Sequence, residues 1–382
     1  MVLVSQPGHY ILHSASSSIS ATAVVHGNIP LSINCLVYVH SALFCIVLVL
    51  MLHVTAAADY FTESAKLQFQ ISTTGVPVTG IATIGNDLFV IRSGQPRIDV
   101  YDAETGTTQR NLQLPSLRSQ QYCLAACGFH KCLYVSDDCN SCIHKASSIE
   151  KNESVKLSKF QVCQGINILT RGVQITSLVI NKDHNLLVAC SNVPKLLEYS
   201  TDGVLVRQVN LNISNPCHVR VAQLPTGLYG VLHRDAQNYH YMHSVMDTNG
   251  EVIKHSPLIM RPRPVQYAAQ TFVFGSSCDS SSGSPFGSTS ESSFRSTVTH
   301  DAVPSGLTVS RSGTVFIASR DDNEILVLYE SGDAFKEESL PGSAYGGALN
   351  QPYCVHFDNS KKRLYIGEWG GGRVLCCSAE SK

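Results

Sequence analysis

Residues 314–328 read TVFIASRDDNEILVL, an apolar run, a polar turn and a second apolar run. This order is typical of a β-hairpin. The pattern recurs in six hexapeptides, each of which begins with β-forming apolar residues and ends in small or polar ones. They are LFVIRS from Leu88, LYVSDD from Leu133, LLVACS from Leu186, YGVLHR from Tyr229, VFIASR from Val315 and LYIGEW from Leu364. Their starts are 45, 53, 43, 86 and 49 residues apart, and a period of about 40 to 50 residues is typical of four-stranded propeller blades.

The flanks of the hexapeptides repeat as well. Each hexapeptide follows an apolar strand and a polar turn, as in GLTVSRSG, and precedes a third strand and a more polar fourth one. A single four-stranded meander cannot bury both faces, so we expect the copies to stack in a ring. The last copy lacks its fourth strand, whereas KLQFQIS from Lys66 is unassigned. The sequence therefore predicts an all-β fold, a six-bladed β-propeller with four-stranded blades, closed by an N-terminal strand in the last blade.

The spacing of 86 residues needs its own explanation. Residues 275–299 are about half serine, a composition that cannot form a core, and predict a disordered insertion. A degenerate seventh blade around PVQYAAQTFVF, residues 264–274, is the alternative. The expected domains are an N-terminal extension, residues 1–58, and a propeller, residues 59–382.

The repeat is best seen in PSGLTVSRSGTVFIASRDDNEILVL, residues 304–328. It resembles the NHL-repeat and related TolB-like six-bladed propellers, over about residues 60–377. The resemblance implies the fold; the Asp that this family carries after the second strand stands only in the second copy, as LYVSD.

The N-terminal apolar segment, residues 36–60, predicts entry into the secretory route. It ends in Ala56-Ala57-Ala58, which suits cleavage of a signal peptide after Ala58. A signal anchor is the alternative, because the segment is long enough to span a bilayer. Twelve of the 14 cysteines follow Ala58, a number typical of an oxidising compartment. We therefore expect a secreted protein, or alternatively a single-pass membrane-anchored one, with N-glycosylation acceptors at Asn152 and Asn212.

A cluster of cysteines, CLAACGFHKCLYVSDDCNSCIHK, occupies residues 123–145. Cys127, Cys132, Cys139 and Cys142 have spacings that zinc ligands also show. Cys132 and Cys139, however, stand at opposite ends of one strand, roughly 20 Å apart, so one zinc ion cannot bind both. Disulfides Cys127–Cys132 and Cys139–Cys142 are the prediction, and free thiols the remaining alternative.

The residues that end the six hexapeptides should gather at one mouth of the ring. We expect loops there to bind a protein or glycan partner, with Trp369 as an aromatic anchor. The predicted partner-binding mouth residues are Arg92, Asp137, Asp138, Asn192, His233, Arg234, Asp235, Arg320, Asp321, Glu368 and Trp369. The first hypothesis is thus a non-catalytic extracellular binding module without a cofactor.

Two other functions remain open. Propellers of the gluconolactonase and paraoxonase kind hold calcium in the channel, and Asp137, Glu368 and Asn192 offer oxygen ligands for a hydrolase of that kind. The chain has no HExxH or GxSxG motif. An intracellular NHL-type domain that binds protein or RNA is the third hypothesis. Nucleic acid is not the expected partner, because 28 Lys plus Arg balance 29 Asp plus Glu.

Overall fold

The computed structural model describes three N-terminal strands and, with gaps, residues 65–379. The gaps are residues 73–74, 115–122, 138–141, 148, 150–154, 163–173, 192, 214–217, 235–239, 259–303 and 332–333. The chain divides into two compact units, Met1–Ala56 and Ala57–Lys382. The first unit contains an antiparallel sheet of β1 (Val2–Gln6), β2 (His9–His13) and β3 (Thr22–His26).

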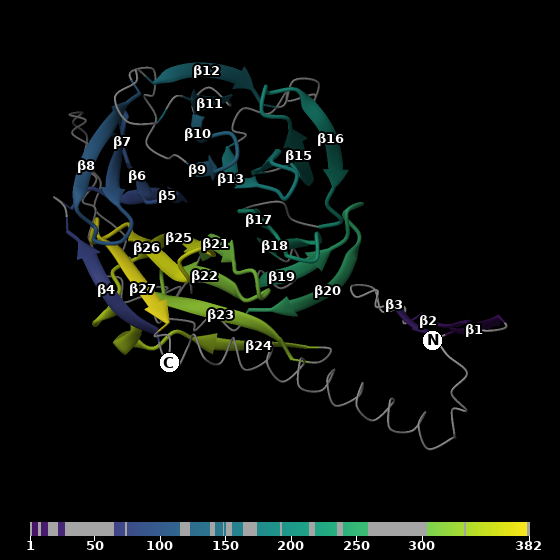
Figure 1. Ribbon diagram of the computed structural model, residues 1–382. Helices are drawn as coiled ribbons and strands as arrows, with labels where there is room; N and C mark the ends of the chain where they lie inside the picture. The colour runs from purple at the N-terminus through teal and green to yellow at the C-terminus, as the bar shows by residue number, and fades with distance from the viewer. Residues whose placement is uncertain are drawn as a thin grey trace, which may run out of the picture. The chain divides into compact units, whose positions relative to one another are not determined.

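The second unit contains six antiparallel sheets of four strands, which we number as blades (Figure 1). Blade 1 is β5 (Val78–Ile84), β6 (Asp87–Arg92), β7 (Arg97–Asp102) and β8 (Thr108–Gln113). Blade 2 is β9 (Leu124–Cys127), β10 (Cys132–Asp137), β11 (Cys142–Ser147) and β12 (Lys156–Gln161). Blade 3 is β13 (Ile175–Ile180), β14 (Leu186–Cys190), β15 (Lys195–Tyr199) and β16 (Leu205–Asn210).

The other three blades continue round the ring. Blade 4 is β17 (Arg220–Gln223), β18 (Tyr229–Arg234), β19 (Tyr241–Met246) and β20 (Val252–Pro257). Blade 5 is β21 (Pro304–Val309), β22 (Val315–Ser319), β23 (Glu324–Ser331) and β24 (Ala334–Ser339). Blade 6 is β25 (Pro352–Asp358), β26 (Arg363–Glu368), β27 (Val374–Ala379) and β4 (Ala65–Ile71). A short 3-10 helix, η1 (Gly342–Tyr345), precedes blade 6.

The six hexapeptides form the second strand of each blade, as predicted. In Figure 1 the first strands surround the centre of the ring, and the last strands lie at its rim. Each second strand is therefore covered by a neighbouring strand on both edges and by a neighbouring blade on both faces. This explains why these strands read as continuous apolar runs instead of alternating patterns.

The ring closes through strand exchange, which confirms the prediction for the N-terminal strand. β4 pairs with β27 in antiparallel register, with Gln70 opposite Leu375 and Phe69 opposite Cys376. Figure 1 shows β4, in dark blue, beside the yellow β27. The outer edge of blade 6 is thus supplied by the N-terminal end of the propeller.

Blades 4 and 5 pack directly against each other. Leu232 and Tyr241 of blade 4 share one apolar cluster with Val315 and Ile317 of blade 5, and β17 contacts β21. No blade separates them, so the prediction of six blades is confirmed. The Ser-rich insertion and PVQYAAQTFVF lie outside the described residues.

The core is divided into six apolar clusters, each between two adjacent blades. Tyr134, Tyr229 and Tyr365, all from second strands, are among the largest fully buried side chains. Burying one large apolar side chain stabilises a fold by about 1.5 to 3 kcal/mol. Cys376 and Cys377 enter different clusters, since adjacent strand residues point to opposite faces.

Among the residues that the structure describes, no helix is long and apolar enough to cross a membrane. The apolar segment of residues 36–60 lies outside them.

Candidate functional site

The first strands of the six blades enclose a cavity of about 330 Å³ along the axis of the ring. Its lining is mixed, with apolar side chains alongside hydroxyls, thiols, amides and one guanidinium. Among the described residues that line it there is no Asp or Glu. Arg220 therefore gives the cavity a positive charge that no lining carboxylate balances.

A repeated β-bulge places polar side chains in this cavity. In blades 1, 3, 5 and 6 the register of the first strand shifts by one residue. The residues at these shifts are Thr79, Thr176, Ser305 and Tyr353, and all four line the cavity. A bulge re-aims a side chain, which explains how a residue on an apolar strand faces the channel.

The hydroxyls at these bulges have local backbone partners. Thr176 Oγ1 donates to the carbonyl of Ala189 at 3.2 Å, and Ser305 Oγ donates to the carbonyl of Pro352 at 3.0 Å. Tyr353 takes the same place in blade 6 with a longer side chain. Burial raises the pKa of Tyr353, and the positive charge of Arg220 partly opposes this.

Arg220, the first residue of β17, is the central polar group of the site. Its Nε is buried and has no hydrogen-bond partner among the described residues. A buried guanidinium N–H without a partner is costly, and a ligand acceptor would satisfy it.

Arg220 and two further arginines, Arg234 and Arg320, lie near His218 at the mouth of the channel where β17 begins. Partial desolvation lowers the pKa of His218, which is still exposed to solvent, and the charges of Arg220, Arg234 and Arg320 lower it further. Arg234 ends β18 of blade 4 and Arg320 follows β22 of blade 5. We call His218, Arg220, Arg234 and Arg320 the basic mouth cluster. Among the described residues, the carboxylate of Asp321 reduces the charge of this cluster, since Arg320 Nε lies 3.1 Å from Asp321 Oδ1.

An aromatic pair stands beside the same mouth. The rings of Tyr353 and Trp369 are 5.0 Å apart between centroids and tilted by 43°. Trp369, which is half-buried, is held by its backbone N–H on the carbonyl of Gln351. It is the single tryptophan of the chain, so its fluorescence reports on this part of the ring.

Four of the predicted mouth residues are buried, which corrects the expectation that they present their side chains to a partner. They are Arg92, Asp137, His233 and Glu368. Their positions end the second strands, where neighbouring strands and blades cover the side chains. Arg234, Arg320, Asp321 and Trp369 are half-buried, and Asp138, Asn192 and Asp235 lie outside the described residues.

Two of the buried residues have clear structural roles. Arg92, 2% exposed, donates to Asp99 at 3.1 Å and to the carbonyl of Gly372 at 2.9 Å, which ties blade 1 to blade 6. Glu368, fully buried, accepts two hydrogen bonds of 2.6 Å from Arg373 and one of 2.8 Å from the Asn350 backbone. His233 Nε2 lies 2.8 Å from Ser244 Oγ.

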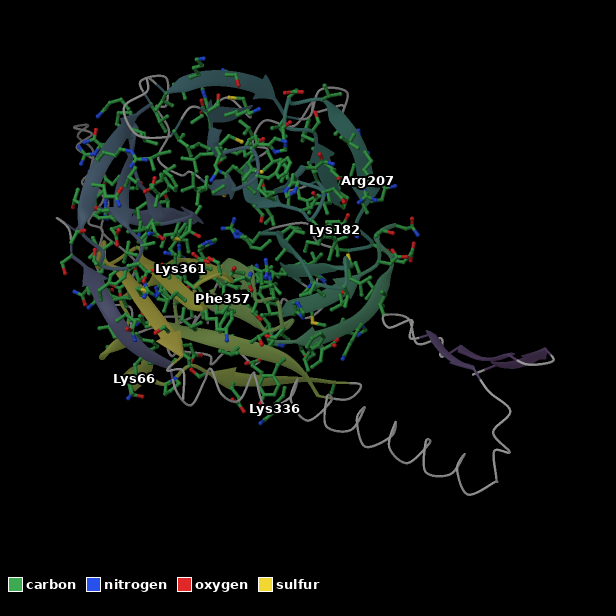
Figure 2. The ribbon with its side chains drawn as sticks, in the orientation of Figure 1. Lys66, Lys182, Arg207, Lys336, Phe357 and Lys361 are labelled. Carbon is green, nitrogen blue, oxygen red and sulfur yellow. The ribbon has the colours of Figure 1, made fainter. Side chains whose placement is uncertain are left out.

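Further charged pairs lie away from the channel. Arg207 on β16 donates to Glu198 and to the hydroxyl of Tyr229 (Figure 2). Lys361, also labelled there, pairs with Glu104 at 2.6 Å and so links blade 6 to blade 1. These contacts join strands and blades, so we assign a structural role to Arg207 and Lys361.

The predicted disulfide positions are partly visible. Cys127 and Cys132 are register partners on β9 and β10, both buried, and both are free thiols in the structure. Cys142 is also a free thiol, whereas Cys139 lies outside the described residues. The two disulfides therefore stay predictions. Of the glycosylation acceptors, Asn212 is exposed and Asn152 is not described.

The sequence analysis missed Arg220, His218 and Tyr353. A signal for Tyr353 was present, because the second residue of the first strand is a hydroxyl residue in four blades, just before Gly80, Ser177, Gly306 and Cys354. This second position of the first strand can be recognised as the channel-facing one only after the sequences of the blades have been aligned with one another.

No protein-family profile and no curated protein sequence matches this chain. Solved structures do resemble it. Hydrazine synthase of Kuenenia stuttgartiensis matches with a TM-score of 0.50 and 13% identity, over 80% of this chain and 96% of that one. Inactive virginiamycin B lyase from Staphylococcus aureus, solved with quinupristin, matches with a TM-score of 0.50 and 10% identity, over 82% and 99%.

The WD40 propeller domain of Doa1 is also similar, with a TM-score of 0.48 and 10% identity, over 83% of this chain and 98% of that one. The two matches with a TM-score of 0.50 show the fold and not the activity, because their identities are only 13% and 10%. The fold that the resemblance of the repeats implied is therefore confirmed: the chain is a six-bladed β-propeller.

Proposed function

We propose that this protein is a non-catalytic binding module that holds an acidic group of a protein or glycan partner at the mouth of its channel. The position of Arg220 carries the proposal. Its guanidinium faces a cavity lined without carboxylates and has a buried Nε that lacks an acceptor among the described residues. A planar guanidinium matches carboxylate, sulfate and phosphate oxygens.

The neighbouring groups suit the same role. Arg234 and Arg320 add positive charge from blades 4 and 5, and long-range attraction of this kind raises association rates. The Tyr353–Trp369 pair offers an aromatic face next to the charge. A cavity of about 330 Å³ has room for one side chain or one sugar ring rather than for a whole domain.

The contacts of Glu368 argue against the calcium-dependent hydrolase. Both of its carboxylate oxygens accept hydrogen bonds from Arg373, and a calcium ion needs several free oxygen ligands. The positive charge of Arg220 opposes a cation in the same channel. These observations favour the binding module, and calcium remains the alternative to be tested.

We also propose that the protein acts outside the cell, or on its surface. The cysteine content and the segment of residues 36–60 support this, and Asn212 is exposed and accessible to glycosylation. Expression of the tagged chain in a secretory cell line tests it. We expect the protein in the medium, with a mass that falls on glycosidase treatment. In Asn212→Gln this fall in mass should be smaller. Unglycosylated protein in the cytosol contradicts the proposal.

The fluorescence of Trp369 tests the binding function. We expect a saturable change on titration with glucuronate or with a short poly-glutamate peptide, and none with glucose at the same concentration. The charged probes separate the glycan partner from the protein partner. Equal responses to glucose and glucuronate, or none to any probe, contradict the proposal.

A further inference from the structure

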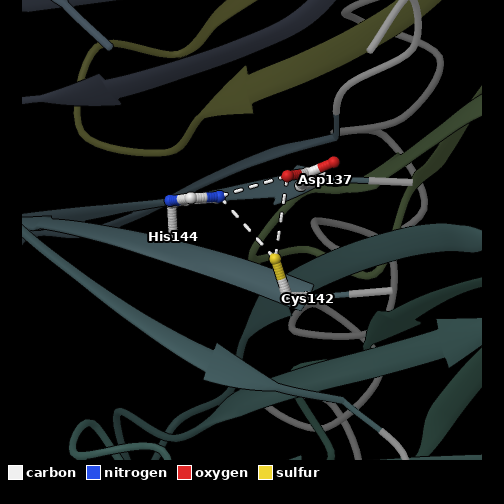
Figure 3. Close-up of side chains that lie close together, drawn as sticks. All are labelled: Asp137, Cys142 and His144. Carbon is white, nitrogen blue, oxygen red and sulfur yellow. Dashed lines mark hydrogen bonds and ion pairs between the residues drawn. The ribbon is translucent and has the colours of Figure 1, made fainter. Parts of the chain in front are cut away.

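Blade 2 brings a carboxylate, a thiol and an imidazole together away from the channel cavity. Asp137 is the last residue of β10 and Cys142 the first residue of β11, and the two are direct register partners. His144 lies two residues further along β11, so its side chain shares a face with that of Cys142. Figure 3 shows the three side chains directed toward one point.

The distances between the three ligand atoms fit a single metal ion. His144 Nε2 lies 3.3 Å from Asp137 Oδ2 and 3.6 Å from Cys142 Sγ, and Sγ lies 3.8 Å from Oδ2. In a tetrahedral zinc site, bonds of about 2.0 Å to nitrogen and oxygen and about 2.3 Å to sulfur place the ligand atoms about 3.3 to 3.6 Å apart. The observed separations are within a few tenths of an ångström of these values.

The surroundings also suit a metal. The exposed fractions of Asp137, Cys142 and His144 are 1%, 0% and 4%, and burying a carboxylate is costly unless it is paired or binds a metal. A mixed oxygen, nitrogen and sulfur set matches zinc better than calcium or magnesium, which take oxygen ligands.

We propose that Asp137, Cys142 and His144 bind a zinc ion. The ion fastens the end of β10 to the start of β11. Three protein ligands leave one tetrahedral position for a water molecule or a further residue. This site differs from the four-cysteine set that the spacing offered, since Cys142 is the one cysteine that the two sets share.

The proposal competes with one of the predicted disulfides. Cys142 cannot bind zinc through its thiolate and also form a disulfide with Cys139. Mass spectrometry after alkylation of the chelator-treated protein, denatured without a reductant so that the buried thiol is accessible, distinguishes the two. An alkylated Cys142 is expected, and a Cys139–Cys142 disulfide overturns the proposal.

Cobalt provides the direct test, because tetrahedral cobalt is coloured and a bound thiolate adds a near-ultraviolet charge-transfer band. The full chain, stripped with a chelator, is titrated with Co²⁺ alone and then with Zn²⁺. We expect one cobalt per chain, a charge-transfer band, and displacement by zinc. Cys142→Ser should remove the band, whereas Cys190→Ser, a buried strand-end cysteine of blade 3, should keep it.

Affinity gives a second readout. Asp137→Asn and His144→Gln should weaken cobalt binding more than about 100-fold, since loss of outer partners alone costs about 10- to 100-fold. If these variants fail to fold, X-ray absorption on the zinc-loaded wild type replaces them. One sulfur with nitrogen and oxygen neighbours is expected. A shell of three or four sulfurs, or no stoichiometric metal, contradicts the site.

Discussion

Arg220 on β17 of blade 4 interacts electrostatically with Tyr353 on β25 of blade 6, across the channel, and its positive charge counters the rise in the pKa of the Tyr353 hydroxyl. Blade 5 lies between them in the ring, so this contact spans the axis and not a neighbouring interface. A β-bulge aims Tyr353 inward, and Tyr353 in turn contacts Trp369. A ligand that binds Arg220 will therefore alter the surroundings of Tyr353 and, through the ring contact, of the tryptophan.

Because β4 closes the ring, we expect Ile71 to contribute more to the free energy of unfolding than its place in an outer strand suggests. Ile71 ends β4 and is buried with Val78 and Val374, between blades 1 and 6. Ile71→Ala should lower the free energy of unfolding by about 2 to 4 kcal/mol, as for other buried large-to-small changes. Urea denaturation measures this. Gln68→Ala, at an exposed position of the same strand, should cost less than about 0.5 kcal/mol; equal effects would mean that β4 does not close the ring.

Two turn glycines separate backbone strain from steric clash. Gly250 has φ 89° and Gly313 has φ 90°. A Cβ at Gly250 would collide with the carbonyl of Asn210, whereas one at Gly313 meets nothing within 4 Å. Gly313→Ala should therefore cost about 1 to 2 kcal/mol from the left-handed backbone alone. Gly250→Ala should cost clearly more in the same denaturation experiment, and equal costs would contradict the close approach of that turn to β16.

Buried His243 makes the fold sensitive to acid. Burial and, to a lesser extent, the charges of His233 and Lys254 lower its pKa from 6.5 to about 4. A histidine whose folded pKa is lower than its unfolded pKa is protonated more readily after unfolding. Stability should therefore fall as the pH drops from about 6.5 toward 4, by about 2 kcal/mol between pH 7 and pH 5.

His243→Leu isolates this contribution. The substitution removes the titrating group and leaves the other groups of the ring in place. Chemical denaturation at pH 7 and pH 5 should show a smaller loss of stability in the variant than in the wild type. Identical losses in both proteins would show that the imidazole is not held neutral.

Sequence alone was sufficient for most of the fold because the blades repeat. The six hexapeptides share an apolar pattern because each second strand is covered by neighbouring strands and blades on all sides. The unassigned strand from Lys66 identified the closure, because a ring with one missing strand has one place for it. The count of six blades followed from the spacing and is supported by the contact of blades 4 and 5.

The site was harder to predict because exposure depends on neighbouring blades. Arg92 and Glu368 are charged residues that end their strands, so the repeat pattern predicts that both lie at the mouth of the channel. Two of their partners lie in the segment between β26 and β27: the carbonyl of Gly372 reaches Arg92 from another blade, and the guanidinium of Arg373 folds back on Glu368 in its own blade. The repeat pattern of a strand shows neither contact. Arg220 was missed because it begins the short inner strand β17, which has no hexapeptide pattern.

The metal cluster was hidden for a related reason. The spacing of the cysteines directed attention to Cys127, Cys132, Cys139 and Cys142 as one set. The geometry instead groups Cys142 with Asp137 and His144, since the register of β10 and β11 places Asp137 opposite Cys142. Register, and not sequence spacing, decides which ligands meet.

The most direct test of the binding function compares Arg220→Gln with the wild type in the Trp369 fluorescence titration with glucuronate and with poly-glutamate. Loss of a charge-assisted hydrogen bond, about 1.5 to 3 kcal/mol, should weaken binding by about 10- to 150-fold. Arg97→Gln, at a surface arginine with 44% side-chain exposure, should bind as the wild type does. Unchanged affinity in a folded Arg220→Gln would contradict the account, because the acidic group would then be held elsewhere.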